Sequence, residues 1–180
     1  MRSNKFFNKF LILIVSFIFI FIAVIYLAFP LKYREDIKEN CDKFRVDFYL
    51  VIAVVKTESN FVPDANSNKG AIGLMQIMPP TAEYIAESIL NEELGDVYQP
   101  KINIRYGVAY LKYLQDKFSD DYTSLAAYNA GEGNVVRWLK DERYSKDGKL
   151  VEIPFKETKK YVESILFYKK IYKIIYPYIT

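Results

Sequence analysis

Apolar residues fill one uninterrupted stretch near the start of the chain, from Phe10 to Phe29, and no charged residue interrupts it. About 20 apolar residues is the length of a helix that crosses the hydrocarbon layer of a membrane. Arg2, Lys5 and Lys9 precede the stretch, and positive charge collects on the cytoplasmic side of membrane helices. The pattern predicts a single-pass anchor, with residues 1–30 as a cytoplasmic stub plus membrane helix and residues 31–180 as an extracytoplasmic domain.

A cleaved signal peptide is the alternative interpretation of the same stretch. Signal peptides have a shorter apolar core, roughly 7–15 residues, followed by a cleavage site flanked by small residues. The best candidate cut follows Ala28, which places the bulky Tyr26 where a small residue is required. Cys41 follows "KEN" and lacks the apolar and small residues expected before a lipoprotein cysteine. The sequence therefore favours an uncleaved anchor.

Beyond the anchor, most of the chain has the periodicity of amphipathic helices. Asp47 is a suitable N-cap for the first of them, and proline at the start of "PPTAEYIAESIL" loses no helical hydrogen bond. Ile104, Val108, Leu111 and Phe118 lie near one face of another. The predicted helices span residues 46–58, 79–90, 102–118, 123–130, 134–140 and 155–175.

Strand signals are few. Only "GAIGLMQIM", residues 70–78, is suited to a short extended hairpin, with Gly70 and Gly73 as turn points. The predicted fold class is mainly α, a helical domain with a small irregular or β lobe, preceded by one transmembrane helix.

Composition excludes several chemistries. The 180 residues contain no histidine and one cysteine, Cys41, so histidine-dependent triads and an internal disulfide are excluded. We expect no metal site and no cofactor. Three of the 25 Lys and Arg residues, and none of the 22 Asp and Glu residues, lie in residues 1–30. The remainder is neutral overall and has no basic stripe, so we expect no nucleic-acid partner.

Glu58 ends the apolar segment "VDFYLVIAVVKTE". The residues three, four, seven and eight positions before it are Val55, Val54, Val51 and Leu50, which share its helical face. Burial among them and the negative end of the helix dipole both disfavour the carboxylate. We expect the pKa of Glu58 to lie above its usual value of about 4.3, as a general acid requires. A solvated glutamate at a fraying helix end is the alternative.

Four motifs, in order along the chain, indicate which protein family this sequence resembles. They are "SNFVPDANSNKGAIGLMQIMPPTA" directly after Glu58, then "NIRYGVAYLKYL", "LAAYNAGEGNVVRWL" and "IPFKETKKYVESIL". Together they resemble the lytic transglycosylase domain of the soluble type, a lysozyme-like family that cleaves the glycan of the bacterial wall. The resemblance covers about residues 44–170.

The resemblance implies that Glu58 is the single catalytic acid and base. In the family the N-acetyl group of muramic acid assists departure of the leaving group, and the 6-hydroxyl of the same sugar replaces water as the attacking group. The implied activity is cleavage of the MurNAc-GlcNAc β-1,4 bond with formation of 1,6-anhydro-MurNAc ends. Most glycosidases use two carboxylates. Asp64, the next carboxylate in sequence, lies in "PDAN", which is typical of a turn.

The resemblance also implies a set of substrate-binding residues in the groove. These are Ser67, Gln76, Met78, Tyr128, Asn129, Glu157 and Tyr161. Structural alternatives stay open for several. Met75, Ile77 and Met78 would suit a core, Tyr128 and Asn129 a buried structural pair, and Glu157 an exposed ion pair with Lys156 or Lys160. Asn103, Arg137 and Trp138 are interpreted as scaffold.

Two other functions fit the same residues. One is a muramidase that uses water on the same polymer, and the mass of the product separates it from a transglycosylase. The other is a wall-remodelling accessory factor of a secretion or conjugation assembly, for which wall binding matters more than cleavage. In all three, the partners are peptidoglycan strands and the membrane.

Overall fold

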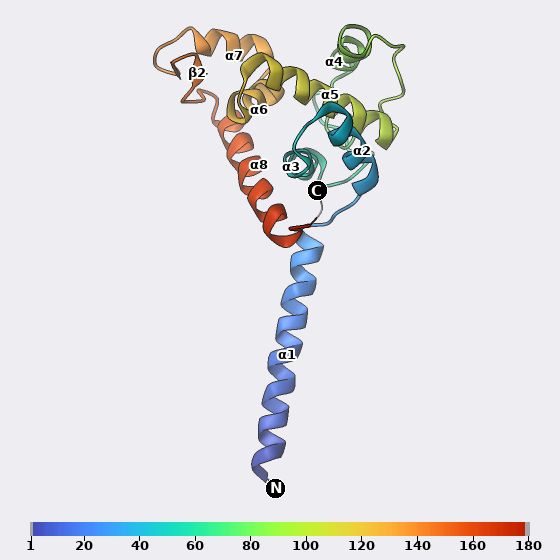
Figure 1. Cartoon of the computed structure of the whole chain (residues 1–180), viewed down its shortest axis with the longest axis vertical. Coiled ribbons are helices and arrows are strands. Elements are labelled where there is room, and N and C mark those ends of the chain that lie inside the picture. Colours follow the sequence, from blue (N-terminus) through green and yellow to red (C-terminus); the bar gives the residue numbers. More distant parts are fainter. Residues whose placement is uncertain (1, 179–180) are drawn as a thin grey trace. The chain divides into compact units, whose positions relative to one another are not determined.

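The computed structural model describes the backbone of residues 2–178 and the side chains of residues 9–178. The side chains of Arg2 and Lys5, which the orientation prediction uses, lie outside the described residues. The chain divides into two units, Met1–Lys32 and Tyr33–Thr180. Figure 1 shows both, coloured along the sequence.

The first unit is a single helix, α1 (Arg2–Ala28). Its segment Lys9–Ala28 has a mean hydropathy of 3.2 in its most apolar window, and none of that window is buried. By length and composition, this is the one helix among the described residues that is apolar enough to cross a membrane.

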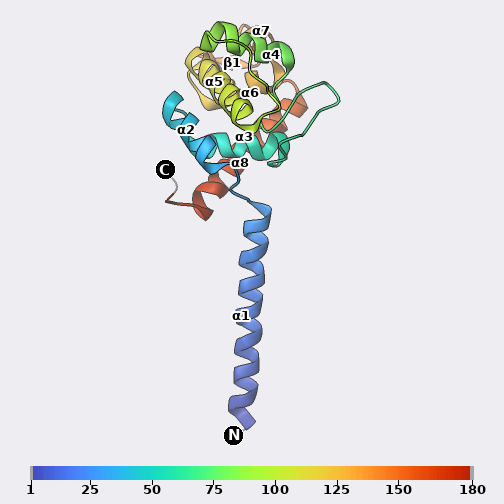
Figure 2. The ribbon, with the colours of Figure 1, turned by 90° about the vertical axis from the view of Figure 1, so that its right-hand side faces the viewer.

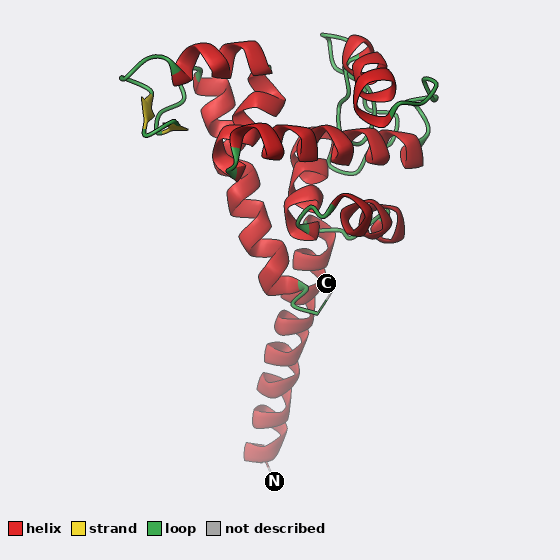
Figure 3. Cartoon of the chain, turned by 45° about the horizontal axis from the view of Figure 1, so that its top comes forward, coloured by secondary structure: helices red, strands yellow, loops and turns green. Residues whose placement is uncertain are grey.

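The second unit is built around α3 (Phe48–Ser59), whose residues 48–55 are all buried. Helix α8 (Lys156–Ile175) packs along α3, while α5 (Pro100–Phe118) packs against α2 (Arg34–Phe44) and α6 (Asp121–Ala130). Figure 3 shows that helices dominate this unit. The helix that carries Glu58 is therefore enclosed by its neighbours, because an apolar helix has to bury every face.

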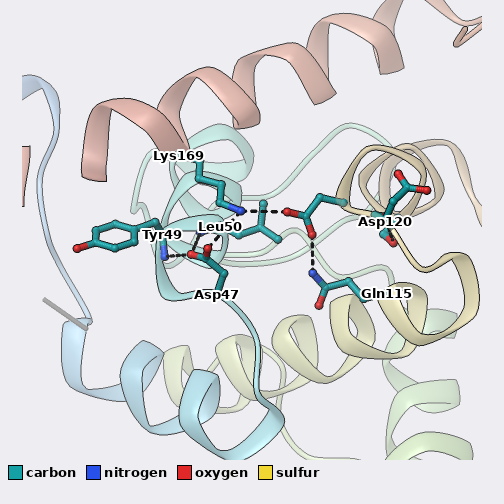
Figure 4. Close-up of polar contacts among 8 residues, drawn as sticks. Asp47, Tyr49, Leu50, Gln115, Asp120 and Lys169 are labelled. Atoms are coloured by element: carbon teal, nitrogen blue, oxygen red, sulfur yellow. Dashed lines mark hydrogen bonds and ion pairs between the residues drawn. The ribbon is translucent and has the colours of Figure 1, made fainter. Parts of the chain in front are cut away.

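The start of α3 is held by ionic contacts. The carboxylate of Asp47 caps the helix, accepting hydrogen bonds from the backbone N–H groups of Tyr49 (2.8 Å) and Leu50 (3.1 Å), as predicted. The Nζ atom of Lys169, on α8, lies 3.2 Å from Asp47 Oδ2 and 3.0 Å from Asp121 Oδ2, on α6 (Figure 4). Lys169 thereby ties the start of α3, the helix that carries Glu58, to α6 and α8.

Helix α2 was not predicted, whereas the other helices of this unit match the predicted segments with one difference. The segment predicted as one helix over residues 79–90 is α4 (Pro79–Tyr84) followed by a π-helix, η1 (Ile85–Leu90). The prolines stand at the first two helical positions, as predicted. Helix α7 (Glu132–Leu139) follows α6 after a break at Gly131, and Trp138 is buried with its ring against Phe155, as the scaffold interpretation requires.

The β structure differs from the prediction. Residues 70–78 form no strand; Ile72 makes isolated antiparallel bridges with Asn66 and Ile77. The sheet consists of β1 (Ser145–Lys146) and β2 (Lys149–Leu150), joined by a tight turn. In Figure 2 the loop that follows α3 extends from the helical part of the unit. This loop, rather than a sheet, borders the site.

Candidate active site

Glu58 lies in the last turn of α3, on the face that the apolar pattern predicts. Val55, Val54, Val51 and Leu50 are all fully buried, so the side chain emerges beside the core. The helix then ends at Asn60, which adopts a left-handed conformation with φ of 50°. The chain turns away there and leaves the carboxyl at the edge of a pocket.

Among the described residues, the Glu58 carboxyl has one polar partner, which comes from the last helix of the chain. The hydroxyl of Tyr161, on α8, donates a hydrogen bond of 2.6 Å to Glu58 Oε1. Burial raises the pKa of Glu58 to about 7, and the Tyr161 hydrogen bond opposes the rise by stabilising the carboxylate. The raised pKa is confirmed, and a solvated glutamate at a fraying helix end does not describe this carboxyl.

The loop from Ala65 to Gln76 forms one wall of the pocket. Ser67 Oγ accepts hydrogen bonds from the backbone N–H groups of Ala71 (2.9 Å) and Lys69 (3.3 Å), which closes a tight turn. The backbone of Gln76 has a φ of 48°, unusual for a residue with a side chain. Its Nε2 donates to the carbonyls of Ala65 and Gly73, both at 3.0 Å. The Gln76 amide therefore braces the loop while lining the pocket.

Asn103, on α5, holds this loop in place through hydrogen bonds. It is buried and makes three hydrogen bonds: its Nδ2 donates to the carbonyls of Ile72 (2.9 Å) and Val97 (3.0 Å), and its Oδ1 accepts from the Met75 N–H (2.8 Å). Gly73 has a φ of 77°, and an added Cβ there would lie 2.4 Å from Asn103 Nδ2. The structural interpretation of Asn103 is confirmed.

The "LMQIM" segment alternates between core and pocket. Met75 and Ile77 are buried, while Met78 is 37% exposed. Core filling therefore explains Met75 and Ile77 but not Met78. Helix α6 supplies the opposite wall, where the Tyr128 hydroxyl donates to the Met75 carbonyl (2.9 Å) and Asn129 Oδ1 accepts from the Thr158 hydroxyl (2.7 Å). Tyr128 and Asn129 thus each bond a different segment rather than each other.

These side chains enclose a pocket of about 350 Å³ with Glu58 in its wall. Every residue that the resemblance singled out takes part: Tyr161 holds the Glu58 carboxyl, and the others line the pocket. Glu157 is exposed and forms no ion pair with Lys156 or Lys160. Asp64 is exposed and does not line the pocket. The lining consists of Glu58, Ser67, Lys69, Ala71, Gln76, Met78, Tyr128, Asn129 and Glu157.

Two further pockets adjoin this one, and they contain residues that sequence reasoning missed. One is about 260 Å³ and adds Thr81 and Tyr110 to the shared Gln76, Met78 and Tyr128. The other is about 470 Å³ and adds Lys156 beside the shared Lys69. The three pockets overlap in their lining and form one groove past Glu58. Lys69 and Tyr110 both lie inside the quoted motifs, but no local pattern marks either of them as a pocket residue.

The arrangement supports proton transfer by one carboxyl group. A group with a pKa near neutrality can donate a proton and then accept one at a similar pH. The described residues contain no cluster of His, Cys, Asp or Glu side chains suited to a metal ion. The groove beside Glu58 has the concave form and the mix of aromatic and amide groups typical of small-molecule and sugar sites.

Comparison with known proteins identifies a matching family and related sequences. A model of the "Transglycosylase SLT domain" family matches residues 35–151. The chain is 34% identical over 151 residues to the soluble lytic murein transglycosylase of Escherichia coli K12, covering 81% of this chain and 23% of that protein. It is 36% identical over 124 residues to membrane-bound lytic murein transglycosylase C of Histophilus somni, covering 62% of this chain and 34% of that protein.

Solved structures of related proteins have the same fold as this chain over the matched part. An inactive mutant of the lytic transglycosylase Slt from Pseudomonas aeruginosa superposes with a TM-score of 0.73 at 36% identity, over 81% of this chain and 24% of that one. The 70 kDa soluble lytic transglycosylase of Escherichia coli gives 0.75 at 32% identity, over 83% and 25%. The chain spans about a quarter of the length of these relatives.

Proposed function

The chain belongs to the transglycosylase SLT domain family, and we propose that it is a membrane-anchored peptidoglycan lytic transglycosylase. The proposal rests on one observation above the others. Glu58 lies in the wall of a groove with a pKa of about 7 and a hydrogen bond from Tyr161, whereas Glu157, the other carboxyl that lines the pocket, is exposed. The substrate is the MurNAc-GlcNAc β-1,4 bond of the wall glycan.

In the first step, Glu58 acts as the general acid. Tyr161 occupies Oε1, so the proton to be transferred is on Oε2. It moves to the glycosidic oxygen as the bond from that oxygen to C1 of MurNAc breaks, and the N-acetyl group of the same sugar assists at C1. The released strand carries the new hydroxyl. The Tyr161 hydrogen bond stabilises the carboxylate that this step creates, because hydrogen bonds to the charged form favour it.

In the second step, the Glu58 carboxylate acts as the base. It removes the proton of the MurNAc 6-hydroxyl, and that oxygen bonds to C1 as the assisting oxygen of the N-acetyl group leaves C1, which closes the 1,6-anhydro ring. Glu58 is protonated again and no water has been added. A single carboxyl suffices because the acid of the first step is the base of the second, so its pKa needs to lie near the ambient pH in both roles.

We assign roles to the other groove residues from the groups that remain available for substrate after their contacts within the protein. Tyr128 has its hydroxyl engaged by the Met75 carbonyl, which leaves the ring to stack on a sugar face. Asn129 accepts from Thr158 through Oδ1, which leaves its NH₂ for an N-acetyl carbonyl. Ser67, Gln76, Met78 and Glu157 complete the contact surface along the groove.

The mass of the product tests this function. Purified wall sacculi are digested with the full chain in detergent, and the released muropeptides are weighed. We expect ends lighter by one water than those of a muramidase. Hydrated, reducible ends alone would establish the hydrolase instead, and a full chain that binds sacculi but releases nothing would favour the accessory factor. The Glu58→Gln chain, purified in parallel, is the control for contaminating activity.

We also propose that Lys9–Ala28 anchors the enzyme as a single membrane-spanning helix. The support is its length and hydropathy, together with the basic residues before it and the similarity to membrane-bound relatives. The folded unit would then lie outside the cytoplasm. The full-length chain should remain in the membrane fraction after a high-salt wash, and external protease should degrade the folded unit in spheroplasts. Recovery of a shortened soluble form would contradict the anchor.

A further inference from the structure

The second half of α8 has an exposed apolar side. Among the large apolar side chains described in the folded unit, Tyr178 (93% exposed) and Ile174 (74%) are the most exposed, and Phe167 is 57% exposed. Phe167 and Ile174 are seven positions, about two turns, apart, so they lie on one side of the helix. Tyr161 and Tyr172 are buried and lie on roughly the opposite side. The exposed residues therefore point away from the rest of the folded unit and from the groove.

Positive charge accompanies this apolar side. Residues 164–178 contain three lysines and no acidic residue. One of the three bonds two aspartates, whereas Lys170 and Lys173 are exposed and take part in none of the ion pairs formed among the described residues. Lys170 lies three positions after Phe167 and four before Ile174, so it shares their side of the helix. The α8 face thus consists of Phe167, Lys170, Lys173, Ile174 and Tyr178.

The α8 face lies at the end of the unit where the chain enters it. The hydroxyl of Tyr49, at the start of α3, donates a hydrogen bond of 2.6 Å to the carbonyl of Tyr176, directly after α8. Helix α2, the first of the unit, also packs against α3. Figures 1 and 2 both show the end of α8 and the start of α2 on the same side of this unit. Glu58 lies near the other end of α3, roughly 14 Å along the helix from Tyr49.

The covalent connection to the proposed anchor is short. Helix α1 ends at Ala28, and the folded unit begins at Tyr33. The chain from Ala28 to Tyr33 spans at most about 18 Å when fully extended. With Lys9–Ala28 in the bilayer, the point where the chain enters the unit therefore lies within about that distance of the end of the membrane helix. The end of the unit that carries the α8 face is the end tethered to the membrane.

We propose that the α8 face docks onto the anionic surface of the bilayer that holds the anchor. This inference rests on the membrane anchor of the proposed function. Apolar residues beside basic ones are typical of helices that lie in the headgroup region, where tyrosine rings are favoured. The lysines of the face pair with lipid phosphates. Because the face points away from the groove, a docked unit keeps its groove open to the wall glycan.

A second copy of the chain is the alternative occupant of the face. A symmetric dimer formed through it would bring Lys170 and Lys173 of both copies together, and like charges at close range repel each other. An anionic lipid surface attracts them instead, and each lysine favours the contact by about fivefold. The charge of the face therefore favours lipid over a second copy.

The test uses the full chain in nanodiscs that each hold one chain, which excludes a second copy. The lipid is phosphatidylcholine with or without phosphatidylglycerol. A nitroxide is attached at Ile174→Cys or, as the control position, at Val151→Cys beyond β2, where the parent side chain is 54% exposed. Buried Cys41, with its pKa raised to about 12, should not react, and the parent chain checks this. Paramagnetic resonance measures whether lipid-soluble oxygen or a water-soluble nickel chelate reaches each label.

We expect the label at position 174 to be shielded from the chelate in anionic discs, while the label at position 151 stays in water. Lys170→Gln with Lys173→Gln should lower the ratio of docked to undocked label by about 25-fold, as should removal of phosphatidylglycerol. The matched control, Lys146→Gln with Lys149→Gln in β1 and β2, should leave the ratio unchanged.

Three results would overturn the proposal. The first is a label at position 174 that the chelate reaches as freely as the label at position 151. The second is shielding that neither the lysine substitutions nor neutral lipid reduce. The third is shielding that occurs only in discs prepared with two chains, which would identify a second copy as the occupant.

Retention of the chain by the discs in about 1 M salt, where surface charges are screened, reports the anchor separately, and neither measurement requires cleavage of glycan. A chain that is retained but has an accessible label at position 174 keeps the anchor and refutes the docking. A chain that salt removes, but whose label is shielded on anionic discs at low salt, refutes the anchor and supports the docking.

Discussion

Replacing Glu58 with Gln separates its chemistry from its cost to stability. The amide keeps the shape of the side chain and can still accept the hydrogen bond from Tyr161, but it has no proton to donate and no charge to bury. In the parent, burial raises the pKa of Glu58 from 4.5 to about 7. Each tenfold change in the dissociation constant corresponds to about 1.4 kcal/mol, so the proton stabilises the folded parent by about 3 kcal/mol.

The sign of this effect follows from the raised pKa. The stabilisation is fully present below pH 4.5 and is lost as the pH rises through about 7, because the folded state binds the proton more tightly than the unfolded state does. The Gln variant has no such dependence. At a few °C per kcal/mol for a unit of this size, its melting temperature should rise relative to the parent by roughly 6–12 °C between pH 4.5 and pH 8.

Activity and melting are measured on the same preparations. General acid–base catalysis contributes about 10²–10⁴-fold, and here one residue performs both halves. The loss in sacculus digestion should therefore be at or above the top of that range. Retention of more than about a tenth of the activity, a barrier change of only about 1.4 kcal/mol, would refute the catalytic assignment. Melting is monitored by circular dichroism. A difference in melting temperature that does not change with pH would refute the argument that the Glu58 carboxyl is buried.

Two other substitutions test the support of the site. Tyr161→Phe removes the hydrogen bond that lowers the Glu58 pKa, so kcat should fall and the alkaline limb of the pH–rate profile should move upward; an unmoved limb would disconnect Tyr161 from the acid. Gly73→Ala introduces a Cβ 2.4 Å from Asn103 Nδ2 at a φ of 77° and should lower the free energy of unfolding by roughly 1–3 kcal/mol. Gly133→Ala, which meets no atom within 4 Å in α7, should be neutral or slightly stabilising.

Local patterns were enough to predict most of the helices and the character of Glu58. Period and capping depend on neighbours within a few positions, which is why Asp47 as a cap and the apolar face of α3 could be recognised. The motifs that follow Glu58 indicated the family, and the comparisons confirm it. Helix α2 was not predicted, because its sequence "REDIKENCDKF" is polar and its buried residues are few. The π-helical turn of η1 has no pattern of its own.

The site was decided by contacts between distant segments. The Tyr161 hydroxyl reaches Glu58 across 103 positions of sequence, and Asn103 hydrogen-bonds a loop some 30 residues before it. No local rule specifies such pairs, because they depend on how α3, α5 and α8 pack. The apolar face of α3 was enough to predict that the Glu58 pKa would rise. The extent of burial, however, is a property of the packed unit. Only the tertiary structure decided how far it rises and which hydroxyl opposes the rise, since both depend on the side chains that packing brings around the carboxyl.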